Sequence, residues 1–378
     1  STNEQIPQKE QELSTASSLS SELIKKDIIC LPIIPWDFRY QRPQHLLSKF
    51  AENGHRVFYF NSILKPLTSS YEIKEIKKNI FQINISSKNF FDIYKDKFDK
   101  STIAILLENF KSLQTNLKLD PIIFIEFPTW SPLAIALKKK YGWKIIFDCL
   151  DDFHGFSNIF NKETEENDLI ANSNLVLASA DMLFKKSSEL SEHVLLLPNA
   201  CEFSHFNKPE KTSVLSNLKK PIVGYFGAIA EWFDVELVEY LAKNRQNLDF
   251  VFIGSTYGSD IRKLNTLDNV HFLGEKNYSE LPNYLHKFNA CLIPFKITNL
   301  IKSTHPVKIY EYFSAGKPVI STSIPELTSM KKLCYIGTDQ KDFLEKLDVA
   351  LEENDPQLLQ QRIEFASSND WTHRFNSL

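Results

Sequence analysis

Glycine is scarce in this sequence and occurs only ten times in 378 residues. A residue without a side chain serves where the backbone turns sharply or approaches another group closely, so each glycine marks a place of that kind. Five of the ten follow strand-like apolar runs between residues 220 and 320: Gly224, Gly227, Gly254, Gly274 and Gly316. The ends of parallel strands form the binding crevice of an α/β sheet. The sequence therefore predicts a ligand crevice in this part of the chain.

Three further absences narrow the class of protein. The net charge is −3, whereas a nucleic-acid binder carries a clear basic excess, so we expect no nucleic-acid partner. No apolar run approaches the ~18 residues of a membrane-spanning helix. The five cysteines form no Cys-x-x-Cys pair and no cluster with histidine, which predicts free thiols and no zinc site. We therefore expect a cytoplasmic protein without a metal, and the inner face of the membrane is left open as its location.

The apolar runs form two alternating series after a polar start. Residues 1–26 contain few apolar positions and predict a disordered or weakly helical tail. From residue 27 onward, strand-like runs alternate with helical segments, and a second series follows the polar segment 207–220. Strand–helix–strand units of this kind form parallel sheets. We therefore predict an α/β fold in which two Rossmann-like domains face an interdomain cleft.

The most informative segment, residues 305–321, reads HPVKIYEYFSAGKPVIS. Pro306 suits the first position of a helix, which Thr304 or its neighbour would then cap. The free N–H groups at a helix start bind anions, and Lys308 adds a positive charge beside them. Glu311 lies three residues further along, on the same helix face and within reach of a sugar hydroxyl pair. The pattern predicts a site for a nucleotide diphosphate, although an amphipathic helix with a Lys–Glu ion pair explains the same spacing.

This segment resembles the donor-site signature of GT-B glycosyltransferases, especially those of family 4, in which a glutamate binds the nucleotide ribose. Glu311 matches that glutamate, while the position eight residues earlier is Ser303 where the family usually has a second glutamate. The resemblance covers about residues 27–378. It implies a nucleotide-sugar-dependent glycosyltransferase of hexosyl type that retains anomeric configuration, with no cofactor and no metal.

The same resemblance implies a role for each domain of the chain. It implies an acceptor domain at residues 27–207 and a nucleotide-sugar domain at residues 208–360. The ending, residues 361–378, resembles the last helix of the GT-B fold, which crosses back to the first domain. The segment PNACEFSHF, which contains Asn199, is similar to the turn at the interdomain boundary of these enzymes.

The resemblance also names donor-side residues. Many relatives place an Arg and a Lys after the glycine loop that begins at Gly224, but this chain has Ala-Ile-Ala-Glu there. Two buried phosphates without cations would be costly, so we expect Lys308 first, and Arg39 or Arg42 second, to supply the charge. Leu273 matches the strand end that packs on the nucleobase. The expected donor-side residues are Glu311, Lys308, Gly227, Leu273, Tyr310, Ser303, Thr304 and Asn199.

Two segments of the first domain are expected at the cleft. WDFRYQRPQ, after the first strand, resembles the Gln-Arg-Pro-Gln segment of bacterial cell-surface polysaccharide glycosyltransferases of the teichuronic-acid type. It provides Trp36, Arg39, Gln41 and Arg42 for the acceptor or phosphate side. The alternative is structural, with Arg42 in a salt bridge and Trp36 packed.

The second segment, FDCLDDFHGF, follows a strand and is rich in acids. Glycosyl transfer needs an acceptor hydroxyl to be oriented and deprotonated, which a carboxylate can do. We expect Asp151 to be catalytic, because related sequences have a similar Asp-x-x-Asp-Asp arrangement whose first acid is structural. Asp152 and His154 are the other catalytic candidates. All of these acids are equally compatible with helix caps or a solvated edge.

The expected partners are a nucleotide-sugar donor and a growing surface glycan or lipid-linked acceptor. Peripheral membrane association is left open. The chain lacks an initiator Met, so membership of a larger multidomain glycan assembly protein is left open as well. Two other functions fit the same pattern. A nucleotide-sugar 2-epimerase shares the architecture and needs no acceptor site. A catalytically silent binding module would explain Ser303 and the missing phosphate cations.

Overall fold

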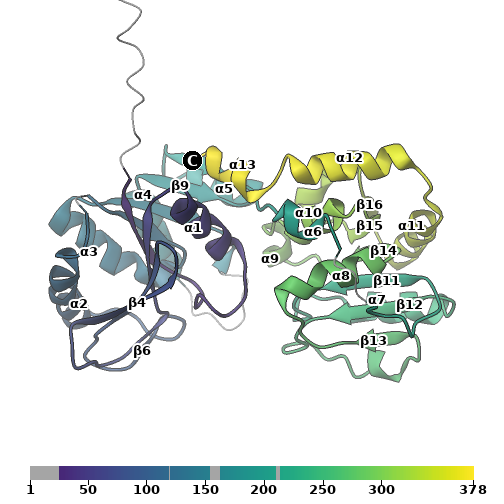
Figure 1. The fold of residues 1–378 in the computed structure, drawn as a ribbon, viewed down its shortest axis with the longest axis horizontal. Coiled ribbons are helices and arrows are strands. Elements are labelled where there is room, and N and C mark those ends of the chain that lie inside the picture. The colour runs from purple at the N-terminus through teal and green to yellow at the C-terminus, as the bar shows by residue number, and fades with distance from the viewer. Residues whose placement is uncertain (1–24, 119, 154–161, 210–212) are drawn as a thin grey trace, which may run out of the picture.

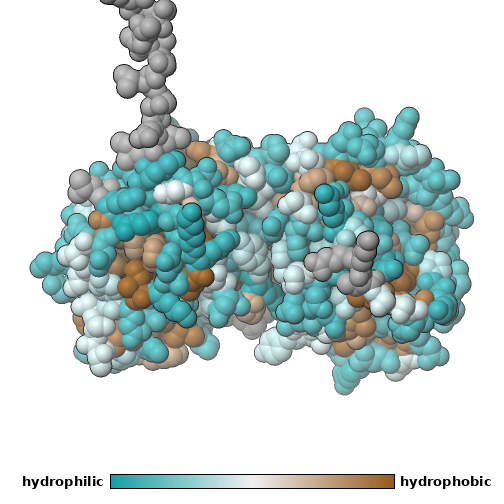
Figure 2. Space-filling model, viewed as in Figure 1, coloured by the Kyte–Doolittle hydropathy of each residue, from teal (hydrophilic) through white to brown (hydrophobic). Residues whose placement is uncertain are grey.

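The computed structural model describes residues 25–118, 120–153, 162–209 and 213–378. The tail predicted at residues 1–26 thus lies outside the described residues, apart from its last two. Two α/β domains stand side by side, and the C-terminal helices run along one edge of both (Figure 1). The surface seen in this view is mostly hydrophilic, with hydrophobic side chains gathered in smaller areas on each domain (Figure 2).

The N-terminal domain is built on a sheet of eight described strands in the order β10-β9-β8-β7-β1-β2-β5-β4. All neighbours are parallel except β4 and β5, which form an antiparallel hairpin at one edge. The strands are β1 (Asp27–Leu31), β2 (Arg56–Phe60), β4 (Tyr71–Lys77), β5 (Ile80–Ile85), β7 (Ile122–Ile125), β8 (Lys144–Cys149), β9 (Leu175–Ala178) and β10 (Val194–Leu196). A small separate pair joins β3 (Ile63–Leu64) to β6 (Phe91–Asp92).

Helices cover both faces of this sheet. They are α1 (Arg42–Glu52), α2 (Lys100–Gln114), α3 (Ser131–Tyr141), α4 (Glu163–Asn172) and α5 (Asp181–Ser188), with a 3-10 turn η1 (Pro128–Trp130). In β1, Ile29 and Leu31 join one apolar cluster, while Ile28 and Cys30 join the cluster on the opposite face. A strand buried on both faces reads as a continuous apolar run, which explains why the sequence predicted these strands without alternation.

The C-terminal domain has a fully parallel sheet of six described strands in the order β13-β12-β11-β14-β15-β16. They are β11 (Ile222–Phe226), β12 (Asp249–Ile253), β13 (Val270–Phe272), β14 (Ala290–Ile293), β15 (Val319–Thr322) and β16 (Tyr335–Gly337). The chain order reverses between β11 and β14. In open α/β sheets a ligand crevice lies at that point, outside the carboxyl ends of the strands.

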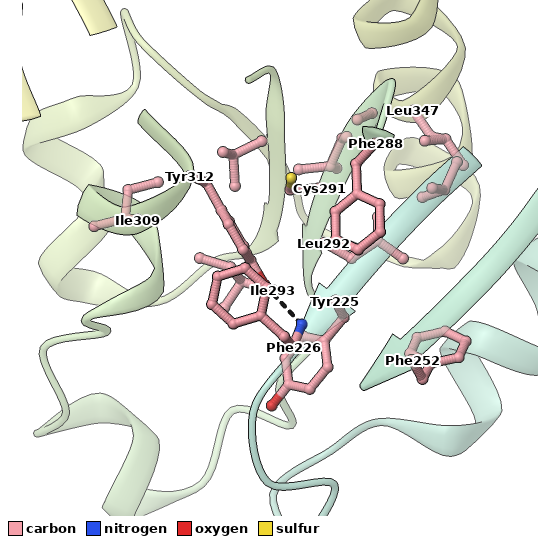
Figure 3. Packing of buried hydrophobic residues seen from close by; sticks show 14 of the residues in the cluster. Tyr225, Phe226, Phe252, Phe288, Cys291, Leu292, Ile293, Ile309, Tyr312 and Leu347 are labelled. Carbon is pink, nitrogen blue, oxygen red and sulfur yellow. Dashed lines mark hydrogen bonds between the residues drawn. The ribbon is translucent and has the colours of Figure 1, made fainter. Parts of the chain in front are cut away.

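The remaining helices pack on this sheet or join the two domains. They are α6 (Phe203–Phe206), α7 (Val235–Asn244), α8 (Leu281–Lys287), α9 (Asn299–Lys302), α10 (Lys308–Ser314), α11 (Gln340–Glu352), α12 (Pro356–Ser367) and α13 (Trp371–Asn376), with 3-10 turns η3 (Leu264–Thr266), η4 (Tyr278–Glu280) and η5 (Pro325–Met330). Aromatic rings fill the core beneath β11 (Figure 3). There Tyr312 of α10 accepts a hydrogen bond from the backbone N–H of Phe226, 3.2 Å away, which ties α10 to the end of β11.

The C-terminal segment connects the two domains. Helix α12 packs on α10, and α13 packs on α1 of the N-terminal domain. Trp371 is 2% exposed and stacks on His45 at 5.1 Å between ring centroids. Phe375 meets Phe50 edge-on at 5.0 Å. A polar break at residues 368–370 divides the last segment into these two helices.

Two properties of the described part of the chain concern membranes and metals. None of its helices combines the length and the apolar character that spanning a bilayer requires. It also contains no group of three or more His, Cys, Asp or Glu side chains suited to holding a metal ion.

Candidate functional site

Lys308, the first residue of α10, places its ammonium over the loop that follows β11. Its Nζ lies 5.4 Å from the centroid of the Tyr225 ring and 5.9 Å from that of Phe295, so two aromatic faces hold it. A Cβ on Gly227 would come within 2.6 Å of Nζ, and Gly227 has a φ of +133°. The positive φ favours glycine at this position, since L side chains rarely adopt it. The ammonium therefore lies directly against bare backbone.

A second glycine extends this bare surface. The N–H of Gly227 donates to the carbonyl of Ile253 at 2.8 Å, so the loops after β11 and β12 run in contact. Gly254 has a φ of +149°, and a Cβ there would collide with the carbonyl oxygen of Gly227. The two loop starts thus present backbone without side chains at these glycines, which allows a ligand to approach closely.

Glu311 lies one turn after Lys308 and is half-buried. Burial raises the pKa of its carboxyl to about 7, against the opposing effect of the Lys308 charge. Burial in turn lowers the pKa of Lys308. Within the described residues neither side chain forms a hydrogen bond or an ion pair with a protein group. The Lys–Glu ion pair considered as the alternative is therefore not formed, and both groups remain available to a ligand.

The start of α10 differs from the sequence prediction. The helix begins at Lys308, two residues after Pro306, and no side chain caps it. Thr304 instead donates its hydroxyl to the carbonyl of Leu300, 2.8 Å away, at the end of α9. The helix has only seven residues, so its dipole is small. The positive charge at this site comes chiefly from Lys308.

Three other residues predicted on the donor side contact other groups of the protein. Ser303 is 2% exposed and donates to the carbonyls of Asn299 and Leu300. Tyr310 is equally buried, and its hydroxyl lies 2.7 Å from Nε2 of His305. Leu273 is half-buried against the core of the C-terminal domain. The hydroxyls of Ser303, Thr304 and Tyr310 bond to the protein itself, and their predicted contacts with the donor stay predictions.

Arg42 forms a salt bridge, which was the structural alternative considered for it. The side chain is 4% exposed and forms a bidentate ion pair with Asp148, with Nη2 2.7 Å from Oδ1 and Nε 2.9 Å from Oδ2. Its Nη1 donates to the carbonyl of Leu197 and to Oδ1 of Asn199. Since Asp148 neutralises this guanidinium, the expectation that Arg42 supplies charge to the donor phosphates is corrected.

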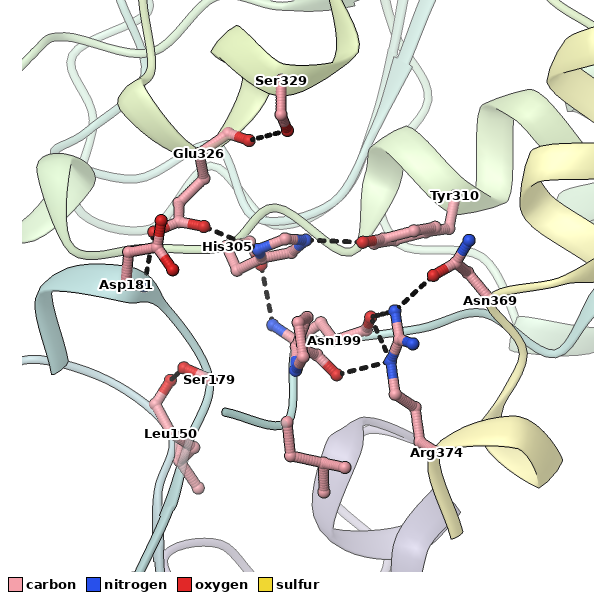
Figure 4. Close-up of polar contacts among 12 residues, drawn as sticks. Leu150, Ser179, Asp181, Asn199, His305, Tyr310, Glu326, Ser329, Asn369 and Arg374 are labelled. Carbon is pink, nitrogen blue, oxygen red and sulfur yellow. Dashed lines mark hydrogen bonds and ion pairs between the residues drawn. The ribbon is translucent and has the colours of Figure 1, made fainter. Parts of the chain in front are cut away.

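Asn199 connects this ion pair to the C-terminal domain. Its Nδ2 donates to the carbonyl of His305 at 2.7 Å, just before α10 (Figure 4). His305 also contacts Glu326, and the other oxygen of Glu326 accepts the N–H of Asp181 at the start of α5. Asn199 thus bonds both to the Arg42 side chain and to the backbone just before α10, and its predicted contact with the donor stays a prediction.

Asp151 follows β8 on the same side as the Arg42–Asp148 pair. It is half-buried, and burial raises the pKa of its carboxyl to about 7, with smaller raising effects from Asp152 and Asp148 and a lowering effect from Arg42. A carboxyl with a pKa near neutrality is suited to general base chemistry. Asp152 is also half-buried and has partners of its own. His154, the third candidate, lies outside the described residues.

The loop after β1 approaches the C-terminal domain. Arg39 forms an ion pair with Glu275, which follows β13, at 2.6 Å between Nη2 and Oε1. Trp36 packs edge-on against Tyr59 at 5.2 Å between ring centroids and is half-buried. Gln41 is exposed at the start of α1. Arg39 thus reaches across to the C-terminal domain, as does Tyr40 of the same loop, whose ring lies 5.7 Å from that of Tyr278.

Sequence analysis did not single out Glu126, which ends the run IIFIE. Its side chain is fully buried, and Oε2 accepts the N–H of Ile33 at 3.2 Å, at the start of the same loop. Its Oε1 has no partner among the described residues. Burial raises the pKa of this carboxyl well above its usual range. An acid ending an otherwise apolar strand was the signal that could have identified it.

The chain is similar in sequence to known glycosyltransferases. Residues 220–360 match the family described as glycosyl transferases group 1. The chain is 25% identical over 374 residues to TuaH of Bacillus subtilis, assigned as a teichuronic acid biosynthesis glycosyltransferase, and the match covers 90% of this chain and 92% of TuaH.

Solved structures share the architecture. Sucrose-phosphate synthase from Thermosynechococcus elongatus superimposes with a TM-score of 0.74 at 15% identity, covering 93% of this chain and 97% of that one. For α,α-trehalose 6-phosphate synthase from Burkholderia multivorans the TM-score is 0.68 at 12% identity, with the same coverage. The predicted fold class, α/β with two Rossmann-like domains in the GT-B arrangement, is confirmed. Over residues 220–360 the chain is similar to the group 1, or family 4, glycosyltransferases, and it is a glycosyltransferase of GT-B fold that uses a nucleotide-sugar donor.

Proposed function

We propose that this enzyme transfers a hexosyl group, with retention of configuration, from a nucleotide-sugar to a cell-surface glycan or lipid-linked acceptor. The observation that carries the donor part is the Lys308 ammonium, which has no anionic partner among the described residues and lies against the bare backbone of Gly227. A diphosphate is an anion that fits such a place, because backbone and cation can approach it together. Glu311, one turn away, accepts the ribose hydroxyls.

The acceptor part of the proposal rests on the N-terminal domain and on resemblance. We assign residues 27–207 to the acceptor and residues 208–360 to the donor, with residues 361–378 joining the two. The likeness to TuaH supports a surface polysaccharide as the acceptor class. One of the structurally similar trehalose-6-phosphate synthases is described as transferring with retention, which supports the same stereochemistry here. Asp151 is the proposed group that orients and deprotonates the acceptor hydroxyl.

Glu311→Ala should weaken binding of the nucleotide by about 1.5–3 kcal/mol, the scale of a hydrogen bond to a charged group. The loss arises because the ribose hydroxyls lose their carboxylate acceptor. Isothermal titration with the nucleoside diphosphate that binds the wild type most tightly measures it. Glu311→Gln, which keeps an acceptor oxygen but no charge, should lose less. Wild-type affinity in a folded Glu311→Ala variant would remove the ribose assignment.

Lys308→Ala should weaken binding of a nucleoside diphosphate much more than binding of the corresponding nucleoside. The reason is that the ammonium contacts the phosphates and makes no contact with the base. Titrating both ligands into both proteins gives the comparison. Lys302→Ala, which removes an exposed lysine from the neighbouring α9, serves as the matched control and should change neither affinity. Equal losses for the two ligands in Lys308→Ala would show that this lysine acts on the structure of the site.

A further inference from the structure

The ion pair between Arg39 and Glu275 spans the two domains beside the proposed donor site. Arg39 belongs to the loop after β1, whereas Glu275 directly follows Gly274 at the end of β13. Nη2 and Nε of Arg39 lie 2.6 and 3.1 Å from the same carboxylate oxygen of Glu275. The side chains are 35% and 59% exposed, so water reaches both. An ion pair this exposed contributes little to stability and is easily exchanged for another partner.

Arg39 meets the donor side beside the backbone that Lys308 contacts. Its partner Glu275 follows Gly274, whose carbonyl accepts the N–H of Gly254 at 2.9 Å, and Gly254 lies against the carbonyl of Gly227 next to Lys308. The positive charge of Arg39 also contributes to lowering the pKa of Lys308. The loop after Gly227 adds no positive side chain, because its next three residues are Ala228, Ile229 and Ala230. A diphosphate bound over Gly227 would therefore gain a cation from the loop after β1 if Arg39 turned toward it.

We infer that Arg39 exchanges Glu275 for the phosphates of the donor when a nucleotide-sugar binds, so that Glu275 competes with the donor for this arginine. The inference rests on the donor site proposed above. Arginine forms strong, charge-assisted bonds to phosphate oxygens, and a less exposed site strengthens them. The exchange brings a residue of the acceptor domain onto the donor, which links donor binding to the relative position of the two domains. Because Glu275 binds Arg39 in the donor-free protein, it lowers the affinity for the donor.

A double-mutant cycle tests this exchange. UDP, GDP and dTDP are titrated calorimetrically into the wild type, and the tightest is then titrated into Glu275→Gln, Arg39→Ala and the double variant. Glu275→Gln should tighten binding about two- to fivefold, the scale of a released exposed ion pair. Arg39→Ala should weaken it about 10- to 100-fold, the scale of a lost hydrogen bond to a charged group. The double variant should bind no better than Arg39→Ala, because Glu275 then has no arginine to hold.

Control variants and ligands distinguish failure of the proposed exchange from failure of the proposed donor site. The corresponding nucleoside should bind all four proteins alike, and Asp260→Asn, which breaks the exposed pair with Arg262, should leave diphosphate affinity unchanged. Unchanged affinity in Glu275→Gln would overturn the inference. So would equal tightening with and without Arg39, since that shows simple repulsion by the carboxylate. If none of the three nucleoside diphosphates binds the wild type, both the proposed donor site and the proposed exchange are overturned.

Discussion

Asp151→Asn should remove most of the sugar transfer while donor affinity stays nearly unchanged. The substitution is close to isosteric, and Asp151 lies in the N-terminal domain, away from Lys308 and Glu311 of α10. A positioned general base contributes about 10²- to 10⁴-fold to a rate, so a loss within that range is expected. Turnover and nucleotide affinity are measured on one preparation, together with the melting temperature.

The pH dependence gives a second readout of the same residue. The pKa of Asp151 is raised to about 7 by burial, and a base acts in its deprotonated form. Wild-type turnover should therefore rise as the pH increases through about 7, and the variant should lose this rise. A helix-capping role would give a different result, namely a loss of stability of up to ~2 kcal/mol with turnover retained. Near-normal turnover in Asp151→Asn would leave Asp152 and His154 as the candidates.

Asp148→Asn should lower the free energy of unfolding by about 3–5 kcal/mol, because it leaves the guanidinium of Arg42 buried without its counterion. Both side chains are almost fully buried and the pair is bidentate. Urea unfolding of the two proteins measures the difference. The double variant Arg42→Met/Asp148→Leu should lose less than Asp148→Asn, because no charge is then buried alone. A loss below about 1 kcal/mol would mean that water solvates Arg42, which would argue against its structural role.

Much of the fold could be predicted because it depends on local pattern. The run at Ile28–Leu31 is apolar throughout, and such a run predicts a strand covered on both faces. Gly227 stood out because glycine is rare in this chain, and the structure gives a reason for it, a positive φ. Lys308 and Glu311 could be paired as site residues because helical spacing alone fixes their relative position.

The predictions were wrong or incomplete where contacts between residues far apart in the sequence determine the local structure. The predicted helix start at Pro306 was wrong by two residues because His305 is held by tertiary bonds to Glu326, Tyr310 and Asn199, which fix the preceding backbone. Local capping preferences do not include such bonds. The sequence left open whether Arg42 is a free cation or part of a salt bridge, since its partner Asp148 is 106 residues away. Spacing along the chain gives no information about pairs of that kind.

The central claim, that the C-terminal domain holds a nucleoside diphosphate sugar through Lys308 and Glu311, is tested most directly by thermal shift. The wild type, Lys308→Ala and Glu311→Ala are each screened against UDP-, GDP-, dTDP- and CMP-sugars, because a ligand that binds the native state raises its melting temperature. We expect at least one diphosphate sugar to raise the melting temperature of the wild type, and both variants to lose most of that rise. The account would be contradicted if no diphosphate sugar changed the wild-type melting temperature, or if the shift persisted in full in both variants.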